Sequence, residues 1–355
     1  MSTDFHTLTI RRIDAPTDDS VAITFDVPEE LREQFRHQPG QHLVLKADIG
    51  GDEVRRSYSI CSPVGADPRI AVKRIPNGVF SAWATTSLAP GDTLDVMAPI
   101  GEFTLVPAAD GPKRRVAIAA GSGITPVLSM ITTALTDEPE SEFTLVYGNR
   151  TSQTIMFLDE IEGLKNRFPQ RFSVVHVLSR EPHDVPLFQG RIDGAKVQAL
   201  LDSLLPADAV DDWYLCGPLD LVETVKAKLE GAGVSDERIH YELFFDQRIE
   251  ALPEHAPDET GLAEVAVTLD GRTSVVMVDP AGPSLLDYAR SVRADVPFAC
   301  KGGMCATCKA RVVRGRVTMA KNYALSESQL TDGFVLTCQS HPVDDQPVEL
   351  DFDAR

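Results

Sequence analysis

Short apolar stretches separated by turn residues run through the first third of the chain. Leu43-Val44-Leu45, Ala71-Val72-Lys73 and Thr93-Leu94-Asp95-Val96 are examples, and Pro/Gly turns at residues 38–40 and 89–91 lie among them. Short strands at regular spacing with turn signals are typical of antiparallel sheets and barrels. Residues 1–107 are therefore predicted to form a small antiparallel β-barrel.

The pattern changes after the turn-rich segment 107–112. A continuous apolar strand is predicted at Arg115–Ala119 and a helix at Val127–Leu135, and further buried strands follow at 143–147, 172–178 and 213–216. Continuous apolar strands alternating with helices are typical of a parallel sheet covered on both faces. Residues 108–246 are predicted to form a doubly wound α/β domain.

A third pattern follows an acidic, proline-containing stretch. Residues 246–261 contain two prolines and five acidic side chains, which predicts a semi-rigid linker at 247–260. Strands at Val265–Leu269 and Ser274–Val278 and a helix near Ser284–Ser291 then precede a cysteine-rich loop. This order predicts an α+β domain of the β-grasp ferredoxin type at 261–355, and the fold class is multidomain.

Length and charge narrow the function classes. A chain of 355 residues suggests two or three domains, and no apolar run approaches the roughly 18 residues that a membrane helix needs. The net charge of −19 disfavours nucleic acid and anionic membranes as partners. The first ten residues have neither the basic nor the apolar region of a signal peptide, so we expect a cytoplasmic protein without disulfides.

The charge is distributed unevenly. Residues 261–355 carry 12 acidic and 10 basic side chains, whereas residues 1–260 carry 41 and 24. Residues 301–321 contain six basic side chains and no acidic one. This basic stretch is either a solvated strand face or a docking site for an acidic partner surface.

Four of the six cysteines lie in the last quarter of the chain: Cys300, Cys305, Cys308 and Cys338. The C-x4-C-x2-C spacing with one distant cysteine is that of a plant-type [2Fe–2S] cluster. A zinc site usually pairs two C-x2-C knuckles, and a redox C-x-x-C would leave two of these cysteines idle. The spacing therefore favours the cluster.

A glycine-rich turn follows the first strand of the α/β domain. It consists of Gly121, Ser122, Gly123, Ile124, Thr125 and Pro126. Between a strand and a helix, the glycines let the backbone approach a pyrophosphate, Thr125 can cap the helix, and Pro126 fits its first turn. The turn predicts a dinucleotide site, and an ordinary strand–helix turn is the alternative.

Ser179 and Arg180 follow the strand predicted at 172–178. A guanidinium and a hydroxyl at this point can bind the 2′-phosphate that distinguishes NADP from NAD. NADPH is therefore expected, with NADH possible. The alternative for Arg180 is a surface side chain paired with an acidic neighbour.

Arg56, Ser57, Tyr58 and Ser59 resemble the R-x-Y-S flavin signature of the ferredoxin–NADP reductase superfamily, and further motifs follow in that family's order. They are Gly78-Val79-Phe80-Ser81, Gly101-Glu102-Phe103, the glycine-rich turn, Cys216-Gly217-Pro218 and Glu242-Leu243-Phe244. The resemblance is specific because the order is kept over the whole reductase part.

The resemblance implies a role for each motif. Arg56 would pair with the FAD pyrophosphate, Tyr58 would pack on the flavin, and Ser59 would bond near flavin N5. Ser81 and the N–H groups of residues 78–81 would complete the phosphate site.

The later motifs belong to the nicotinamide side of the reaction. Cys216, Gly217 and Pro218 would border the nicotinamide, Glu242 would be the carboxylate beside the reacting atoms, and Phe244 would shield the flavin. A buried structural cysteine and a solvated glutamate are the alternatives for Cys216 and Glu242.

The whole chain resembles oxygenase reductases that fuse a flavoprotein to a C-terminal ferredoxin. The segments 297–310, 322–325 and 335–340 are most similar to the reductase subunits of phenylacetyl-CoA epoxidases. The expected function is electron transfer from NADPH through FAD and the [2Fe–2S] cluster to that di-iron oxygenase. The alternatives are an NADH-linked reductase of a Rieske or other multicomponent oxygenase, and an iron–sulfur carrier that does not itself oxidise a nucleotide.

Overall fold

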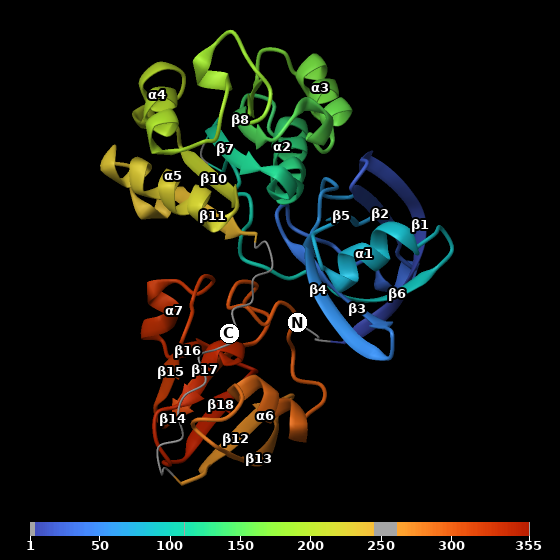
Figure 1. The fold of residues 1–355 in the computed structure, drawn as a ribbon, viewed down its shortest axis with the longest axis vertical. Coiled ribbons are helices and arrows are strands. Elements are labelled where there is room, and N and C mark those ends of the chain that lie inside the picture. Colours follow the sequence, from blue (N-terminus) through green and yellow to red (C-terminus); the bar gives the residue numbers. More distant parts are fainter. Residues whose placement is uncertain (1–3, 110, 245–260, 355) are drawn as a thin grey trace. The chain divides into compact units, whose positions relative to one another are not determined.

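The computed structural model describes residues 4–109, 111–244 and 261–354. Within them the chain forms two compact units. The first carries a six-stranded and a five-stranded sheet, and the second carries a five-stranded and a two-stranded sheet (Figure 1). The predicted linker at 247–260 lies outside the described residues.

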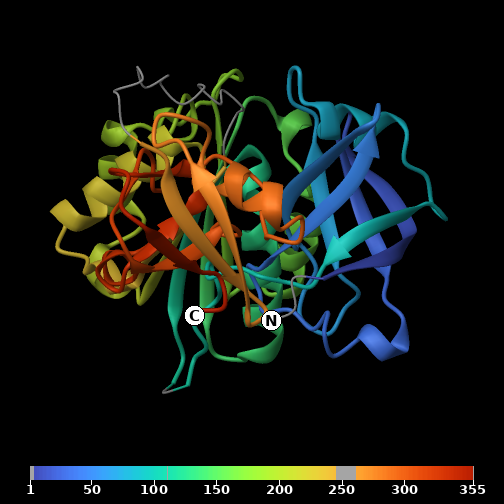
Figure 2. The same cartoon turned by 90° about the horizontal axis from the view of Figure 1, so that it is seen from below.

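The N-terminal sheet has the strand order β4-β3-β6-β1-β2-β5, and an isolated bridge between Ile60 and Ile70 links the end of β4 to β5. Its strands curve around a common apolar interior (Figures 1 and 2). Alternate residues such as Leu8 and Ile10 point into that interior, as expected for strands with one buried face. The predicted antiparallel barrel is confirmed. Its elements are β1 (Phe5–Thr17), β2 (Ser20–Asp26), β3 (His42–Ile49), β4 (Asp52–Ser59), β5 (Arg69–Lys73), α1 (Val79–Thr86) and β6 (Thr93–Met97).

The second sheet of this unit is parallel, with the order β11-β10-β7-β8-β9. Helices α2 and α3 cover one face, and α4 and α5 cover the other (Figure 1). The central strand β7 is therefore buried on both faces, which explains its apolar run from Val116 to Ala120. The predicted doubly wound domain is confirmed. Its elements are β7 (Arg114–Ala120), α2 (Ile124–Asp137), β8 (Glu142–Asn149), α3 (Leu158–Arg167), β9 (Phe172–Leu178), α4 (Gly194–Ser203), β10 (Asp212–Gly217), α5 (Leu219–Gly231) and β11 (Ile239–Leu243).

The C-terminal unit is a mixed sheet, β13-β12-β18-β14-β16, in which β12 and β18 run parallel. Helix α6 begins after Ser284, whose side chain caps the helix, and it buries Leu285, Leu286 and Ala289 in the core of this unit. This is the predicted α+β ferredoxin fold. Its elements are β12 (Ala263–Leu269), β13 (Arg272–Val278), α6 (Leu285–Val292), β14 (Lys309–Arg314), β15 (Val317–Met319), α7 (Glu327–Thr331), β16 (Phe334–Leu336), β17 (Ser340–Pro342) and β18 (Val348–Asp351).

One local prediction is wrong. Thr125 does not cap α2, because residues 121–123 form a 3-10 turn that runs directly into the helix and places Gly123 at the cap position. The Thr125 hydroxyl instead donates to the Ser122 carbonyl at 3.0 Å. The start of α2 therefore has no side-chain cap.

No helix in the described ranges combines the length and apolar composition needed to cross a bilayer.

Candidate functional site

The flavin motif and the helix start at Gly78 lie beside each other. Residues Arg56–Ser59 end strand β4, and Gly78 caps helix α1. The rings of Tyr58 and Phe80 are 5.5 Å apart, which joins the two segments. A Cβ on residue 78 would lie 2.4 Å from both the Ile75 side chain and the Ser81 hydroxyl, so glycine is needed there.

The polar groups of this region fit a phosphate-containing cofactor such as FAD. Helix α1 has no side-chain cap, so its first N–H groups are available to an anion. The Ser57 hydroxyl oxygen is buried without a hydrogen-bond partner. The Ser81 hydroxyl is used within its own turn, since it donates to the Gly78 carbonyl at 3.2 Å and accepts from the Ile75 N–H at 3.3 Å. The contribution of this turn to a phosphate site would thus come from its backbone.

The glycine-rich turn packs tightly against the end of β10. Gly121 has a φ of +54°, a left-handed conformation that favours glycine. A Cβ on Gly123 would lie 2.3 Å from the Cys216 carbonyl oxygen. These contacts bring the turn and the Cys216-Gly217 segment together at the carboxyl edge of the parallel sheet, where open α/β sheets bind their ligands.

Ser59, Cys216 and Glu242 come from three separate segments and meet beside this turn. The Ser59 hydroxyl donates to Glu242 Oε2 at 3.0 Å. Glu242 on β11 is the register partner of Cys216 on β10. Burial, and then the Glu242 carboxylate, raise the pKa of Cys216 well above its usual value, so the thiol stays protonated. Phe244 is half-buried next to them, and its N–H donates to the Gly217 carbonyl at 2.8 Å.

His42 belongs to this cluster and was missed by sequence reasoning. Its Nδ1 lies 3.8 Å from Glu242 Oε1, and its Nε2 is buried without a partner. Burial lowers the pKa of His42 to about 4, so the ring is neutral at physiological pH. A single histidine at the start of a strand carries no motif, and only the sheet geometry places it near Glu242.

Tyr147 on β8 was also missed, although it supports the predicted nucleotide turn. Its ring is fully buried, and its hydroxyl donates to the Gly121 carbonyl at 2.8 Å. Tyr147 therefore holds Gly121, the left-handed glycine of the turn, through this hydrogen bond.

Ser179 and Arg180 follow β9, two strand positions away from β7 at the same edge of the sheet. The Arg180 side chain is exposed, and the backbone N–H of Arg180 donates to the Arg150 carbonyl at 2.8 Å. Adjacent strands lie about 4.8 Å apart, so roughly 10 Å separates this position from the nucleotide turn. A dinucleotide that lies across the edge can reach both.

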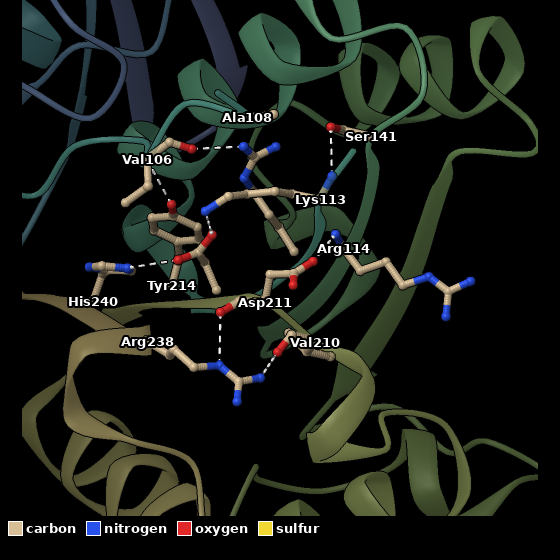
Figure 3. Close-up of polar contacts among 12 residues, drawn as sticks. Val106, Ala108, Lys113, Arg114, Ser141, Val210, Asp211, Tyr214, Arg238 and His240 are labelled. Carbon is tan, nitrogen blue, oxygen red and sulfur yellow. Dashed lines mark hydrogen bonds and ion pairs between the residues drawn. The ribbon is translucent and has the colours of Figure 1, made fainter. Parts of the chain in front are cut away.

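A polar network ties the barrel to the α/β domain (Figure 3). The Val106 N–H donates to the Tyr214 hydroxyl at 2.9 Å, and the Val106 carbonyl accepts from Arg115 at 2.7 Å. Arg115 is 1 % exposed and pairs with Glu138, which also accepts the Ala108 N–H. These contacts fix the segment between the two sheets, which is a condition for Ser59 and Glu242 to meet.

The predicted cluster ligands lie on two segments of the C-terminal unit. Cys300, Cys305 and Cys308 occupy the loop before β14, and Cys338 lies in the 3-10 turn Thr337–Gln339. The loop contains left-handed residues at positions 301, 303 and 306, which keep it tight. The Gly302 N–H donates to the Cys300 sulfur at 3.3 Å, and the Thr307 hydroxyl donates to the Cys305 sulfur at 3.1 Å.

The four thiols interact in two pairs, Cys300 with Cys305 and Cys308 with Cys338. Hydrogen bonding from Cys305, with help from backbone N–H groups, lowers the pKa of Cys300 to about 6. Bonding from Cys308 likewise lowers the pKa of Cys338. Throughout the described ranges, no three His, Cys, Asp or Glu side chains are close enough to hold a single metal ion. The donor set itself, four thiols with N–H donors around their sulfurs, fits an iron–sulfur cluster.

Comparisons with known proteins agree with this layout. An oxidoreductase FAD-binding domain matches residues 8–105, an oxidoreductase NAD-binding domain matches 117–227, and a 2Fe-2S iron-sulfur cluster binding domain matches 267–343. The chain belongs to the family of oxygenase reductase components that join a flavoprotein reductase to a [2Fe–2S] domain. The family resemblance and the FAD, nicotinamide nucleotide and [2Fe–2S] cofactors are thereby confirmed.

Among its relatives, the chain is 44 % identical to a subunit of the 1,2-phenylacetyl-CoA epoxidase of Escherichia coli K12, with 99 % of both chains covered. It is 32 % identical to the ferredoxin reductase component of 3-ketosteroid-9-alpha-monooxygenase of Rhodococcus rhodochrous, covering 97 % of this chain and 96 % of that one. The second relative is the reductase component of a monooxygenase, and the first is a subunit of an epoxidase.

Solved structures show the same fold. Phthalate dioxygenase reductase superposes with a TM-score of 0.61 at 23 % identity and covers 98 % of both chains. An intact type IV self-sufficient cytochrome P450 monooxygenase gives a TM-score of 0.68 at 25 % identity over 98 % of this chain, which corresponds to 41 % of that larger one.

Proposed function

We propose that this chain is the NADPH-dependent reductase component of a phenylacetyl-CoA epoxidase and works in the cytoplasm. The observation that supports the partner is the 44 % identity to the epoxidase relative along the full length of both chains. Relatives from the steroid and betaine monooxygenase systems are 30–32 % identical, which makes a reductase of another oxygenase the second candidate.

The chemistry belongs to the cofactors, and the chain supplies position and surroundings. Bound FAD would supply the conversion of a hydride's electron pair into single electrons, and a bound [2Fe–2S] cluster would supply one-electron transfer to the partner. Arg56 and the start of α1 would hold the FAD pyrophosphate, and Cys300, Cys305, Cys308 and Cys338 would bind the cluster. Ser59 and Glu242, held 3.0 Å apart, would orient the reacting rings, with Cys216 protonated beside them.

Reconstitution tests the partner. Purified holoprotein is combined with candidate oxygenase components, and product formation from phenylacetyl-CoA is measured with NADPH. Epoxide formation that depends on this chain supports the proposal. Normal reduction of ferricyanide together with no coupling to the epoxidase, but coupling to a steroid or betaine oxygenase, would favour the second candidate.

The nucleotide preference is tested at Arg180. Loss of a charge-assisted bond to the 2′-phosphate should raise KM for NADPH about 10–30-fold in Arg180→Ala and leave KM for NADH nearly unchanged. Arg114→Ala, an exposed arginine at the opposite, amino end of the parallel sheet, is the control. An equal change for both nucleotides would contradict the NADP assignment.

The basic stretch Lys301–Lys321 is proposed to dock an acidic surface of the oxygenase, although its charge is partly compensated. Lys301 pairs with Asp287 at 2.8 Å, Arg314 with Glu349 at 3.6 Å, and Arg316 with Asp344. These carboxylates lie elsewhere in the sequence, so the excess of positive charge is smaller than the linear sequence suggests.

Arg311 also belongs to this stretch. Its side chain is exposed and donates to the backbone carbonyl of Asp332. Arg311→Glu should lower coupled turnover about threefold at low ionic strength and less at high salt. Ferricyanide reduction, measured in parallel, should not change, and Arg272→Glu on β13 serves as the charge-matched control. An equal loss with ferricyanide would argue against docking at this surface.

A further inference from the structure

The turn that carries Cys338 is bonded to both ends of the cysteine loop. On one side of Cys338, the Thr337 N–H and hydroxyl donate to the Cys308 carbonyl at 3.2 and 2.9 Å. On the other side, Gln339 Nε2 donates to the Lys301 carbonyl at 2.9 Å. The residues that flank the fourth cysteine therefore hold the first and last parts of the three-cysteine loop.

Gln339 is buried and makes several hydrogen bonds. It is 4 % exposed, and its Nε2 also donates to the backbone carbonyl of Cys338 at 3.0 Å. The backbone carbonyl of Gln339 accepts from the Ala320 N–H at 2.8 Å. The loop packs directly on it, because a Cβ on Gly303 would lie 3.1 Å from Gln339 Cγ. A long side chain with two N–H donors is thus one of the contacts between the two ligand segments.

The loop needs this support because its backbone is in an unusual conformation. Lys301 has a φ of +52°, a left-handed value that side chains with a Cβ rarely adopt. Its carbonyl is held by Gln339, and its ammonium is held by Asp287 at 2.8 Å. Asp287 is fixed in turn by Ser284 at the start of α6. Residues in such conformations persist where neighbouring groups hold them in place.

We propose that Gln339, assisted by Thr337, is the positioning residue that sets the separation between Cys338 and the Cys300–Cys308 loop. It keeps the four sulfurs at ligand spacing and so retains the cluster and shapes its surroundings. The proposal rests on the assignment of the four cysteines as cluster ligands. In this role Gln339 acts through the backbone carbonyls of Lys301 and Cys338.

The test compares Gln339→Leu with Gln346→Leu, which makes the same change at an exposed glutamine of the same unit. Two carbonyls lose a buried donor in Gln339→Leu, and we expect iron to be released to a chelator about tenfold faster than from the parent protein. The visible circular dichroism of the oxidised cluster should change as well. Flavin reduction by NADPH should stay within twofold in both variants.

A release rate within twofold of the parent, with an unchanged cluster spectrum, would overturn the proposal. Should Gln339→Leu fail to accumulate, Thr337→Val takes its place, because the backbone bond to Cys308 remains and only the hydroxyl is lost. About threefold faster release would support the proposal, and an unchanged rate would reject it.

Cys338→Ala separates this proposal from the ligand assignment. A Cys338→Ala protein that keeps a full complement of cluster would refute the ligand assignment. Normal cluster retention in Gln339→Leu alone would refute only the role of Gln339.

Discussion

The cysteine loop and the flavin–nicotinamide site are assembled in different ways. Three of the four predicted cluster ligands lie within nine residues, and the structure adds a single turn around Cys338. Ser59, Cys216 and Glu242 are spread over more than 180 residues and meet only because strands from two sheets end at the same place. A site built from one segment is visible in its spacing, whereas a composite site also depends on the connection that holds its parts together.

This difference predicts that a substitution at one site impairs that site and leaves the other intact. Damage to the cysteine loop should remove the final electron-transfer step and spare the flavin chemistry. Damage to the composite site should change nucleotide binding, pH dependence or stability of the reductase unit and spare the cluster.

The largest effect is expected for Cys338→Ala. Loss of one of four ligands should remove the cluster signal and lower oxygenase-coupled turnover at least about 100-fold, since the cluster is the exit to the partner. Ferricyanide reduction with NADPH should stay within twofold. Iron content and electron paramagnetic resonance measure the cluster, and Cys61→Ala, a buried cysteine of the barrel, is the control. Simultaneous loss of flavin reduction would show that the two sites are not independent.

The pH dependence of stability tests the composite site at His42. The pKa of His42 is about 4 in the folded protein and 6.5 in its ordinary state. The unfolded chain therefore binds the proton first, and the free energy of unfolding falls as pH drops from about 6.5 to 4. We expect this residue to contribute a loss of roughly 3 kcal/mol between pH 7 and pH 4.

Denaturant unfolding of the parent protein and of His42→Gln at both pH values measures that contribution. The variant should be less sensitive to acid by the same amount, because glutamine does not titrate. Equal sensitivity in the two proteins would mean that His42 is not held neutral by burial.

The smallest effect is expected for Tyr147→Phe, which removes the hydroxyl that holds Gly121. Loss of one hydrogen bond should raise KM for NADPH about fivefold and change kcat at saturation less than twofold. Steady-state kinetics with ferricyanide measure both, and Tyr241→Phe, an exposed tyrosine on β11, is the control. A fall in kcat without a change in KM would place the role of Tyr147 elsewhere.

Much of the architecture was accessible from the sequence because local patterns carry it. The alternation in β12 and the unbroken apolar run of β7 follow from how many faces of each strand are buried. The start of α2 was wrong in detail, because a 3-10 turn places Gly123 where a threonine cap was expected. Helix ends depend on backbone hydrogen bonds that composition does not specify.

By itself, the sequence determined the order of the three folds, the flavin and nucleotide motifs and the cysteine spacing, since each is a property of neighbouring residues. Only the tertiary structure decided that His42 and Tyr147 belong to the site, that acidic residues compensate the basic stretch, and that Gln339 joins the two cluster segments. These depend on strand register and on contacts between residues far apart in the chain. The physical reason is that burial and distance, which set pKa values, hydrogen bonds and charge pairing, are defined only after the chain has folded.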